Sequence, residues 1–234
     1  MNKMKHIFFD LDGTLVDEQN WAKEALSKTK NFFLNKYKGK YKKPLVDKLF
    51  SKNNLLSSRK KVASEHTKQL HKTEFRRLYF NEALKPIKDP NIIKEVIVQY
   101  SKNKDRPPPL LSDDTRTVVK YLSQKYILTL LSNSHTRIDG SGIETYFKHT
   151  VRSIDFDKKI RKPDPAIFNH ALKIAGASKD TTIMIGDTPK EDILGAKKAG
   201  LKVIWFNPNK ENFPNSIPRP NFEIHNFLEL MNIL

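Results

Sequence analysis

The sequence predicts an α/β protein with a doubly wound, parallel-sheet core and an inserted all-helical domain. Short continuous apolar runs alternate with helical patterns of about 10–13 residues, which is typical of parallel β-α units. A long stretch after the first apolar run shows only helical periodicity. A chain of 234 residues is long enough for a core and a smaller inserted domain.

The strands predicted for the core are short apolar runs bounded by turn residues. The first covers residues 6–11 and runs into an Asp-Gly turn, which indicates a buried strand. Further strands are expected at 126–131, 182–185 and 202–206, and a weaker pattern lies at 149–153. These runs provide the sheet of the core.

Three core helices carry start and stop signals. Ser112 is the expected N-cap of a helix over 112–124. Asp164 is the expected N-cap of the next helix, which begins with proline and ends at Gly176. A helix over 189–199 follows the same plan and ends before a glycine.

Residues 17–107 are predicted to form the helical insert, so that the core comprises 1–16 and 108–234. The insert ends in Pro107-Pro108-Pro109, which predicts a stiff extended linker. No convincing strand pattern occurs within it. Helical periodicity is found at 21–37, 46–50, 60–81 and 91–101.

The net charge of +17 permits two interpretations. Residues 17–107 hold 23 Lys and Arg against 10 Asp and Glu, a net of +13, so the remainder carries only +4. Such a charge either attracts polyanions or reflects a lysine-rich composition. Because Lys outnumbers Arg 34 to 9 and specific nucleic-acid contacts favour Arg, we expect no specific nucleic-acid partner.

Composition also limits the chemistry and the location. The absence of cysteine excludes disulfides, thiol nucleophiles and Cys-ligated metals. No apolar stretch approaches the roughly 20 residues of a membrane span, so we expect no membrane partner and a cytoplasmic location.

The first chemical motif directly follows the first predicted strand. It places Asp10 and Asp12 at the carboxyl end of that strand, where open α/β sheets bind ligands. Gly13 permits a sharp turn, and Thr14 offers a hydroxyl. Two close carboxylates repel each other, so they favour a hard cation such as Mg²⁺. An Asp-Gly turn that merely caps a loop is the alternative interpretation.

Three further polar clusters are expected at the same edge of the sheet. Ser132 and Asn133 follow the second strand and are suited to phosphate oxygens. Lys162 precedes the prolines of a helix start, where a fixed ammonium can neutralise anions. Asp187 follows the strand at 182–185 as a candidate metal ligand. Asp192, five residues later, either complements a helix dipole or lies near the metal.

Together these motifs resemble the haloacid dehalogenase-like hydrolase superfamily. The matching stretches are FFDLDGTL (8–15), LLSNS (130–134), KPDPAIF (162–168) and GDTPKEDILGAKKAG (186–200). The resemblance implies a Rossmann-like core, and it implies that the insert is the helical cap that many members carry. The true dehalogenases of this superfamily lack the second aspartate, so the presence of Asp12 disfavours dehalogenation.

The resemblance also implies roles for the site residues. Asp10 would be the nucleophile that becomes an aspartyl-phosphate, and Asp12 the general acid and base. Mg²⁺ would be held by Asp10, the carbonyl of Asp12 and Asp187. The residues expected to hold the phosphoryl group are Ser132, Asn133, Lys162 and Thr14.

The expected function is Mg²⁺-dependent hydrolysis of a small phosphomonoester, such as a sugar phosphate, phosphoglycolate or a nucleoside monophosphate. A phosphomutase of similar build remains an alternative, and so does a basic polyanion-binding protein with a vestigial site. The sequence leaves the substrate and the oligomeric state open.

Overall fold

The computed structural model describes residues 4–66, 72–104, 111–134, 138–156 and 160–234. The chain divides into two compact units, one of Met1–Gln19 with Pro107–Leu234 and one of Asn20–Arg106. The predicted proline linker at 107–109 lies outside the described residues.

The first unit is built on a six-stranded parallel sheet with the order β3-β2-β1-β4-β5-β6. Because β1 pairs with both β2 and β4, the chain winds outward from β1 in both directions. Such a reversal of strand order opens a crevice at the carboxyl ends of the central strands. The strands are β1 (His6–Phe9), β2 (Ile127–Ser132), β3 (Phe147–Arg152), β4 (Thr182–Gly186), β5 (Lys202–Phe206) and β6 (Phe222–Ile224).

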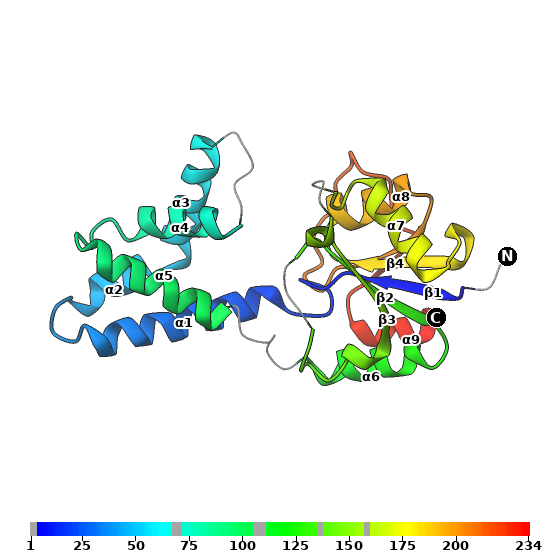
Figure 1. The fold of residues 1–234 in the computed structure, drawn as a ribbon, viewed down its shortest axis with the longest axis horizontal. Helices are drawn as coiled ribbons and strands as arrows, with labels where there is room; N and C mark the ends of the chain where they lie inside the picture. Colours follow the sequence, from blue (N-terminus) through cyan, green and yellow to red (C-terminus); the bar gives the residue numbers. More distant parts are fainter. Residues whose placement is uncertain (1–3, 67–71, 105–110, 135–137, 157–159) are drawn as a thin grey trace. The chain divides into compact units, whose positions relative to one another are not determined.

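Helices cover both faces of this sheet (Figure 1). On one face α7 (Pro165–Ala175) and α8 (Leu194–Lys198) bury Phe8, Met184 and Val203 of the sheet. The other face carries α6 (Asp113–Ser123) and α9 (Leu230–Ile233). The remaining short helices are η1 (Glu144–Tyr146), η2 (Ser153–Asp155), η3 (Lys179–Thr181), η4 (Pro189–Ile193) and η5 (Phe227–Glu229).

The predicted helix boundaries at Ser112, Asp164 and Gly176 are confirmed. The Ser112 hydroxyl accepts a hydrogen bond from the Thr115 amide at 3.0 Å, and the Asp164 carboxylate accepts one from the Ala166 amide at 2.9 Å. Gly176 ends α7 in the left-handed conformation with φ of 58°. Each signal satisfies backbone groups that a helix end leaves without partners.

Several elements of the first unit differ from the prediction, among them β1, the helix at 189–199 and β6. β1 ends at Phe9 instead of residue 11, because the Leu11 carbonyl accepts the amides of Leu15 and Val16 in a closed turn. The helix expected over 189–199 begins as the π-helical turn η4 before α8. The edge strand β6 was not predicted, since three residues are too few for a periodic signal.

The described residues of the second unit form helices and no strand. Their core gathers around Phe33, which packs against Tyr37, Tyr41 and Phe50, and around a Phe80–Tyr100 contact. The helices are α1 (Glu18–Lys36), which starts at the boundary, α2 (Lys43–Leu49), α3 (Lys52–Glu65), α4 (Lys72–Ala83) and α5 (Pro90–Lys104).

The prediction of a single helix at 60–81 is wrong. Its residues belong to two helices, α3 and α4, and residues 67–71 between them lie outside the described part of the chain. The α/β core and the all-helical insert are nevertheless both present, so the predicted fold class is confirmed. Among the described residues, no helix is long and apolar enough to cross a bilayer.

Candidate active site

The loop after β1 places Asp10 at the centre of the sheet's carboxyl edge. The Asp10 amide donates to the Ile185 carbonyl of β4 at 2.9 Å, and the residue is only 6% exposed. The turn continues through Gly13, whose amide donates to the Val16 carbonyl at 2.7 Å. The half-buried Asp12 lies within this turn. The turn therefore fixes the backbone that carries both aspartates.

Gly13 is required at its position for two reasons. Its φ of +93° lies in the region that favours glycine. A Cβ atom there would also lie 2.3 Å from Oδ2 of Asp187, so the missing side chain makes room for that carboxylate. The first motif and the loop after β4 consequently meet at this glycine.

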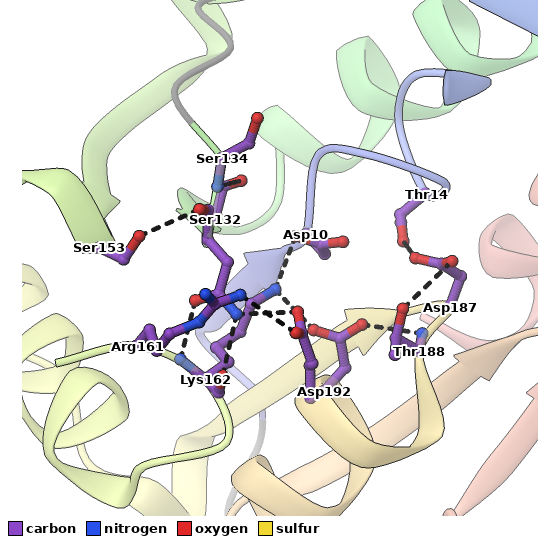
Figure 2. Close-up of polar contacts among 12 residues, drawn as sticks. Asp10, Thr14, Ser132, Ser134, Ser153, Arg161, Lys162, Asp187, Thr188 and Asp192 are labelled. Carbon is purple, nitrogen blue, oxygen red and sulfur yellow. Dashed lines mark hydrogen bonds and ion pairs between the residues drawn. The ribbon is translucent and has the colours of Figure 1, made fainter. Parts of the chain in front are cut away.

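Lys162 is a buried cation between two carboxylates (Figure 2). Its Nζ donates to Oδ1 of Asp10 and to Oδ1 of Asp192, each at 2.6 Å, and the residue is 1% exposed. Burial lowers the pKa of Lys162, but the carboxylates of Asp10 and Asp192 outweigh burial and hold this pKa above its usual value. Lys162 therefore stays charged.

Asp187 follows β4 and is held by three groups. Thr14 Oγ1 donates to Oδ1 of Asp187 at 3.0 Å, and Thr188 Oγ1 lies 3.5 Å from Oδ2. The buried Trp205 donates its indole N–H to the Asp187 carbonyl at 2.8 Å. Burial raises the pKa of Asp187 to about 6, with a further contribution from the Asp192 carboxylate, while the Thr14 hydrogen bond opposes it.

Asp192 is fully buried at the π-helical turn η4. Its Oδ2 accepts the Thr188 amide at 3.0 Å, while its Oδ1 accepts Lys162. The hydrogen bond from Thr188 satisfies a backbone amide at the start of the turn, and the ion pair connects the turn to Lys162. Asp192 thus serves both the helix start and the site, which the sequence left as alternatives.

Three carboxylates converge at this edge. Ligand oxygens of Asp10, Asp187 and Asp192 all lie within 4.8 Å of one another, an arrangement that can hold a metal ion. Burial, followed by repulsion from Asp192 and Asp187, raises the pKa of Asp10 well above its usual value although Lys162 lowers it. Among these four described residues the acids outnumber the ammonium, and oxygen-rich sites with excess negative charge suit a hard divalent cation.

The last residue of β2, Ser132, and the first residue after it, Asn133, lie at the same edge. Ser132 is 1% exposed, and its hydroxyl accepts the Ser134 amide at 3.0 Å. The Asn133 amide contacts the Lys162 backbone and Glu191, and the Asn133 carbonyl accepts the Ser153 hydroxyl at 3.0 Å. The clusters expected at this edge therefore do meet.

The sequence did not indicate every residue that shapes the site. It assigned no role to four residues that contact the predicted ones, which are Glu191, Arg161, Thr188 and Trp205. Glu191 is adjacent to Asp192, and this adjacency of acids was the one available signal. His135, the histidine nearest to these motifs in sequence, lies outside the described residues.

An open α/β sheet with acids, a buried lysine and polar turns at its switch point has these groups where doubly wound proteins bind their ligands. The family model for haloacid dehalogenase-like hydrolase matches residues 4–200. The chain belongs to this family, and the predicted membership and enzyme class are confirmed.

Relatives of known name match along most of the chain. N-acylneuraminate-9-phosphatase from Mus musculus is 26% identical over 100% of this chain and 95% of its own. Glyceraldehyde 3-phosphate phosphatase from Pyrococcus furiosus is 28% identical over 90% of this chain and 83% of its own. The crystal structure of HAD-hydrolase YfnB from Bacillus subtilis shares the fold, with a TM-score of 0.76, 23% identity and coverage of 100% and 99%.

Proposed function

We propose that this chain is a Mg²⁺-dependent phosphatase that hydrolyses a small phosphomonoester through an aspartyl-phosphate at Asp10. The observation that carries the proposal is the convergence of Asp10, Asp187 and Asp192 around the buried Lys162. The phosphatase activities named for the mouse and Pyrococcus relatives support this reaction class.

The residues present fit a magnesium ion. Their donors are carboxylate oxygens. Burial raises the pKa of Asp10 and of Asp187, with a further contribution from the Asp192 carboxylate, and a divalent cation between them would favour their charged forms. Asp10, the carbonyl of Asp12 and Asp187 would hold the ion. When bound, Mg²⁺ neutralises carboxylate and phosphoryl charge and orients the phosphoryl group.

Asp10 is suited to attack phosphorus. Its Oδ1 accepts from Lys162, so Oδ2 is the attacking atom in our proposal. The Asp10 Oδ2–P bond forms as the bond from phosphorus to the leaving oxygen breaks. Asp12 donates a proton to that oxygen. Asp12 then removes a proton from water, which attacks phosphorus, releases phosphate and restores the Asp10 carboxylate.

The polar groups around Asp10 would bind the phosphoryl oxygens. Lys162 supplies a fixed positive charge, and Ser132 and Thr14 supply hydroxyls near the acidic cluster. Positioning and charge neutralisation are the main sources of catalysis in phosphoryl transfer. In the same proposal the helical insert 17–107 is a cap that selects the substrate, and the enzyme acts in the cytoplasm.

The experiment is a phosphate-release screen with Mg²⁺ over p-nitrophenyl phosphate and a panel of phosphometabolites. The panel contains N-acylneuraminate 9-phosphate, glyceraldehyde 3-phosphate, phosphoglycolate and nucleoside monophosphates. We expect release from p-nitrophenyl phosphate and a preference for one class of the panel. Transfer of the phosphoryl group to a sugar without release would establish a phosphomutase instead, and no turnover of any compound would contradict the proposal.

A further inference from the structure

The side-chain amide of Asn133 is fully engaged by the protein. Its Nδ2 donates to the Lys162 carbonyl at 2.9 Å and to Oε2 of Glu191 at 2.8 Å. Its Oδ1 accepts the Lys162 amide at 2.8 Å. An amide has two N–H donors, and both are used here. The side chain of Asn133 therefore brackets the backbone of Lys162.

Glu191 connects this bracket to η4. Its Oε2 accepts from Asn133, and its Oε1 lies 3.4 Å from a guanidinium nitrogen of Arg161, the residue before Lys162. The next residue, Asp192, accepts from the Lys162 ammonium at 2.6 Å. Two successive acids of one turn thus hold the Lys162 segment. Asp192 binds the Lys162 ammonium (Figure 2), and Glu191 contacts Asn133 and Arg161.

We infer that Glu191 is a positioning residue that acts through Asn133, and that the Asn133 side chain positions Lys162 instead of binding phosphate. The inference deepens the proposed function and rests on it. A lysine side chain has many rotamers, so the placement of its ammonium depends on how rigidly its backbone is held. The charge-assisted hydrogen bond from Asn133 to Glu191 supplies that rigidity at the Lys162 backbone, while Asp192 binds the ammonium.

The kinetic test compares Glu191→Ala, Glu191→Gln and Asn133→Ala with the double variant Glu191→Ala/Asn133→Ala. We expect kcat/KM for p-nitrophenyl phosphate to fall about tenfold in Glu191→Ala and in Asn133→Ala, and inhibition by inorganic phosphate to weaken similarly. The double variant should be no worse than the poorer single one, because both substitutions break the same interaction. Glu191→Gln keeps an acceptor and should stay within about threefold of the wild type.

Glu74→Ala is the matched control. Glu74 pairs with Arg77 at 2.6 Å on the helical unit, so its removal deletes a comparable Glu–Arg pair elsewhere. We expect its kcat/KM to match the wild type. Multiplicative losses in the double variant, or equal losses in Glu191→Gln and Glu191→Ala, would overturn the inference.

Hydrogen exchange in the ligand-free protein provides a readout that does not depend on activity. Amide exchange in residues 130–134 and 161–163 should accelerate in Glu191→Ala and remain at wild-type rates in Glu191→Gln and Glu74→Ala. Unchanged exchange in these segments, or acceleration across the whole sheet, would refute the positioning role. A wild-type enzyme that hydrolyses none of the phosphomonoesters would instead refute the proposed function. The exchange result would still decide the role of Glu191.

Discussion

At the scale of single residues, Lys162 determines the electrostatics of the site. Its ammonium lies 2.6 Å from carboxylate oxygens of both Asp10 and Asp192, and all three residues are buried. Burying charges is costly, and only close pairing offsets that cost. The lysine therefore has a structural task, holding acids together, in addition to the proposed task of binding phosphate.

Replacing Lys162 by methionine tests both tasks. The substitution roughly preserves side-chain volume but leaves two buried acids without their cation, so we expect a loss of about 3–5 kcal/mol in the free energy of unfolding. Turnover should fall with it. Urea denaturation measures the stability, and Lys61→Met, at an exposed pair with Glu82, is the control that should leave the midpoint unchanged. A Lys162→Met variant as stable as this control would contradict the account.

At the scale of elements, two loops are fitted to each other at Gly13. The turn after β1 and the loop after β4 approach so closely that a Cβ on Gly13 would overlap the Asp187 carboxylate. This contact connects the turn of the proposed nucleophile, Asp10, to the proposed metal ligand, Asp187. A small change in the backbone of one loop is therefore transmitted to the other.

Gly13→Ala should displace Asp187 and weaken Mg²⁺ binding at least tenfold, because Asp187 is a proposed charged ligand. Gly39→Ala is a matched control. Gly39 also has a positive φ, of +84°, but no atom would lie within 4 Å of a Cβ at this position. Both variants bear the backbone strain of alanine at positive φ. The measurement is Mg²⁺ titration by calorimetry. Equal affinities in the two variants would show that the contact with Asp187 has no effect.

Sequence patterns predicted the elements that have strong local signals. The strands beside β1 and the helix starts at Ser112 and Asp164 were found, because apolar runs and capping residues act locally. The π-helical form of η4 was not, since the ion pair of Asp192 with Lys162 joins residues 30 positions apart. β6 is fixed by pairing with β5 alone and carries little signal of its own.

The candidate site was predicted as a set of residues but not as a network. The sequence placed Asp10, Lys162 and Asp187 at one edge, because strand ends in a parallel sheet meet there. It assigned the Asn133 side chain to phosphate and did not name Glu191. The bond between these two residues spans 58 positions, and no local pattern encodes it.

At the scale of the whole molecule, the charge is unevenly distributed. Residues 17–107 carry +13 of the net +17. Several of these lysines pair with acids, such as Lys36 with Glu95 and Lys43 with Asp47, yet the excess remains large. A strong positive field raises the encounter rate with anions, and the proposed substrates are anions.

We therefore expect kcat/KM to fall as the salt concentration rises from roughly 0.05 to 0.3 M, since the Debye length shrinks over that range. The fall in kcat/KM should be larger for a substrate with two anionic groups than for p-nitrophenyl phosphate, because such a substrate interacts more strongly with the positive field. Duplex DNA should bind only at about 10⁻⁴–10⁻⁶ M, without sequence preference. Identical salt responses for the two substrates would show that the positive charge of residues 17–107 does not attract the substrate. Nanomolar DNA binding at 0.15 M salt would favour a polyanion-binding protein.

The central claim is that Asp10 is the nucleophile of a Mg²⁺-dependent phosphatase. The most direct measurement is the rate of phosphate release from p-nitrophenyl phosphate by the wild type and Asp10→Asn, each with Mg²⁺ and after EDTA treatment. Asp10→Asn is nearly isosteric but removes the attacking charge, and Asp180→Asn on the exposed η3 is the control. We predict that the wild type and the control turn over substrate with Mg²⁺ and not after EDTA treatment. The rate of phosphate release should fall about 10³-fold or more in Asp10→Asn. A freshly purified Asp10→Asn variant within tenfold of the wild type, or full wild-type activity in EDTA, would contradict the claim.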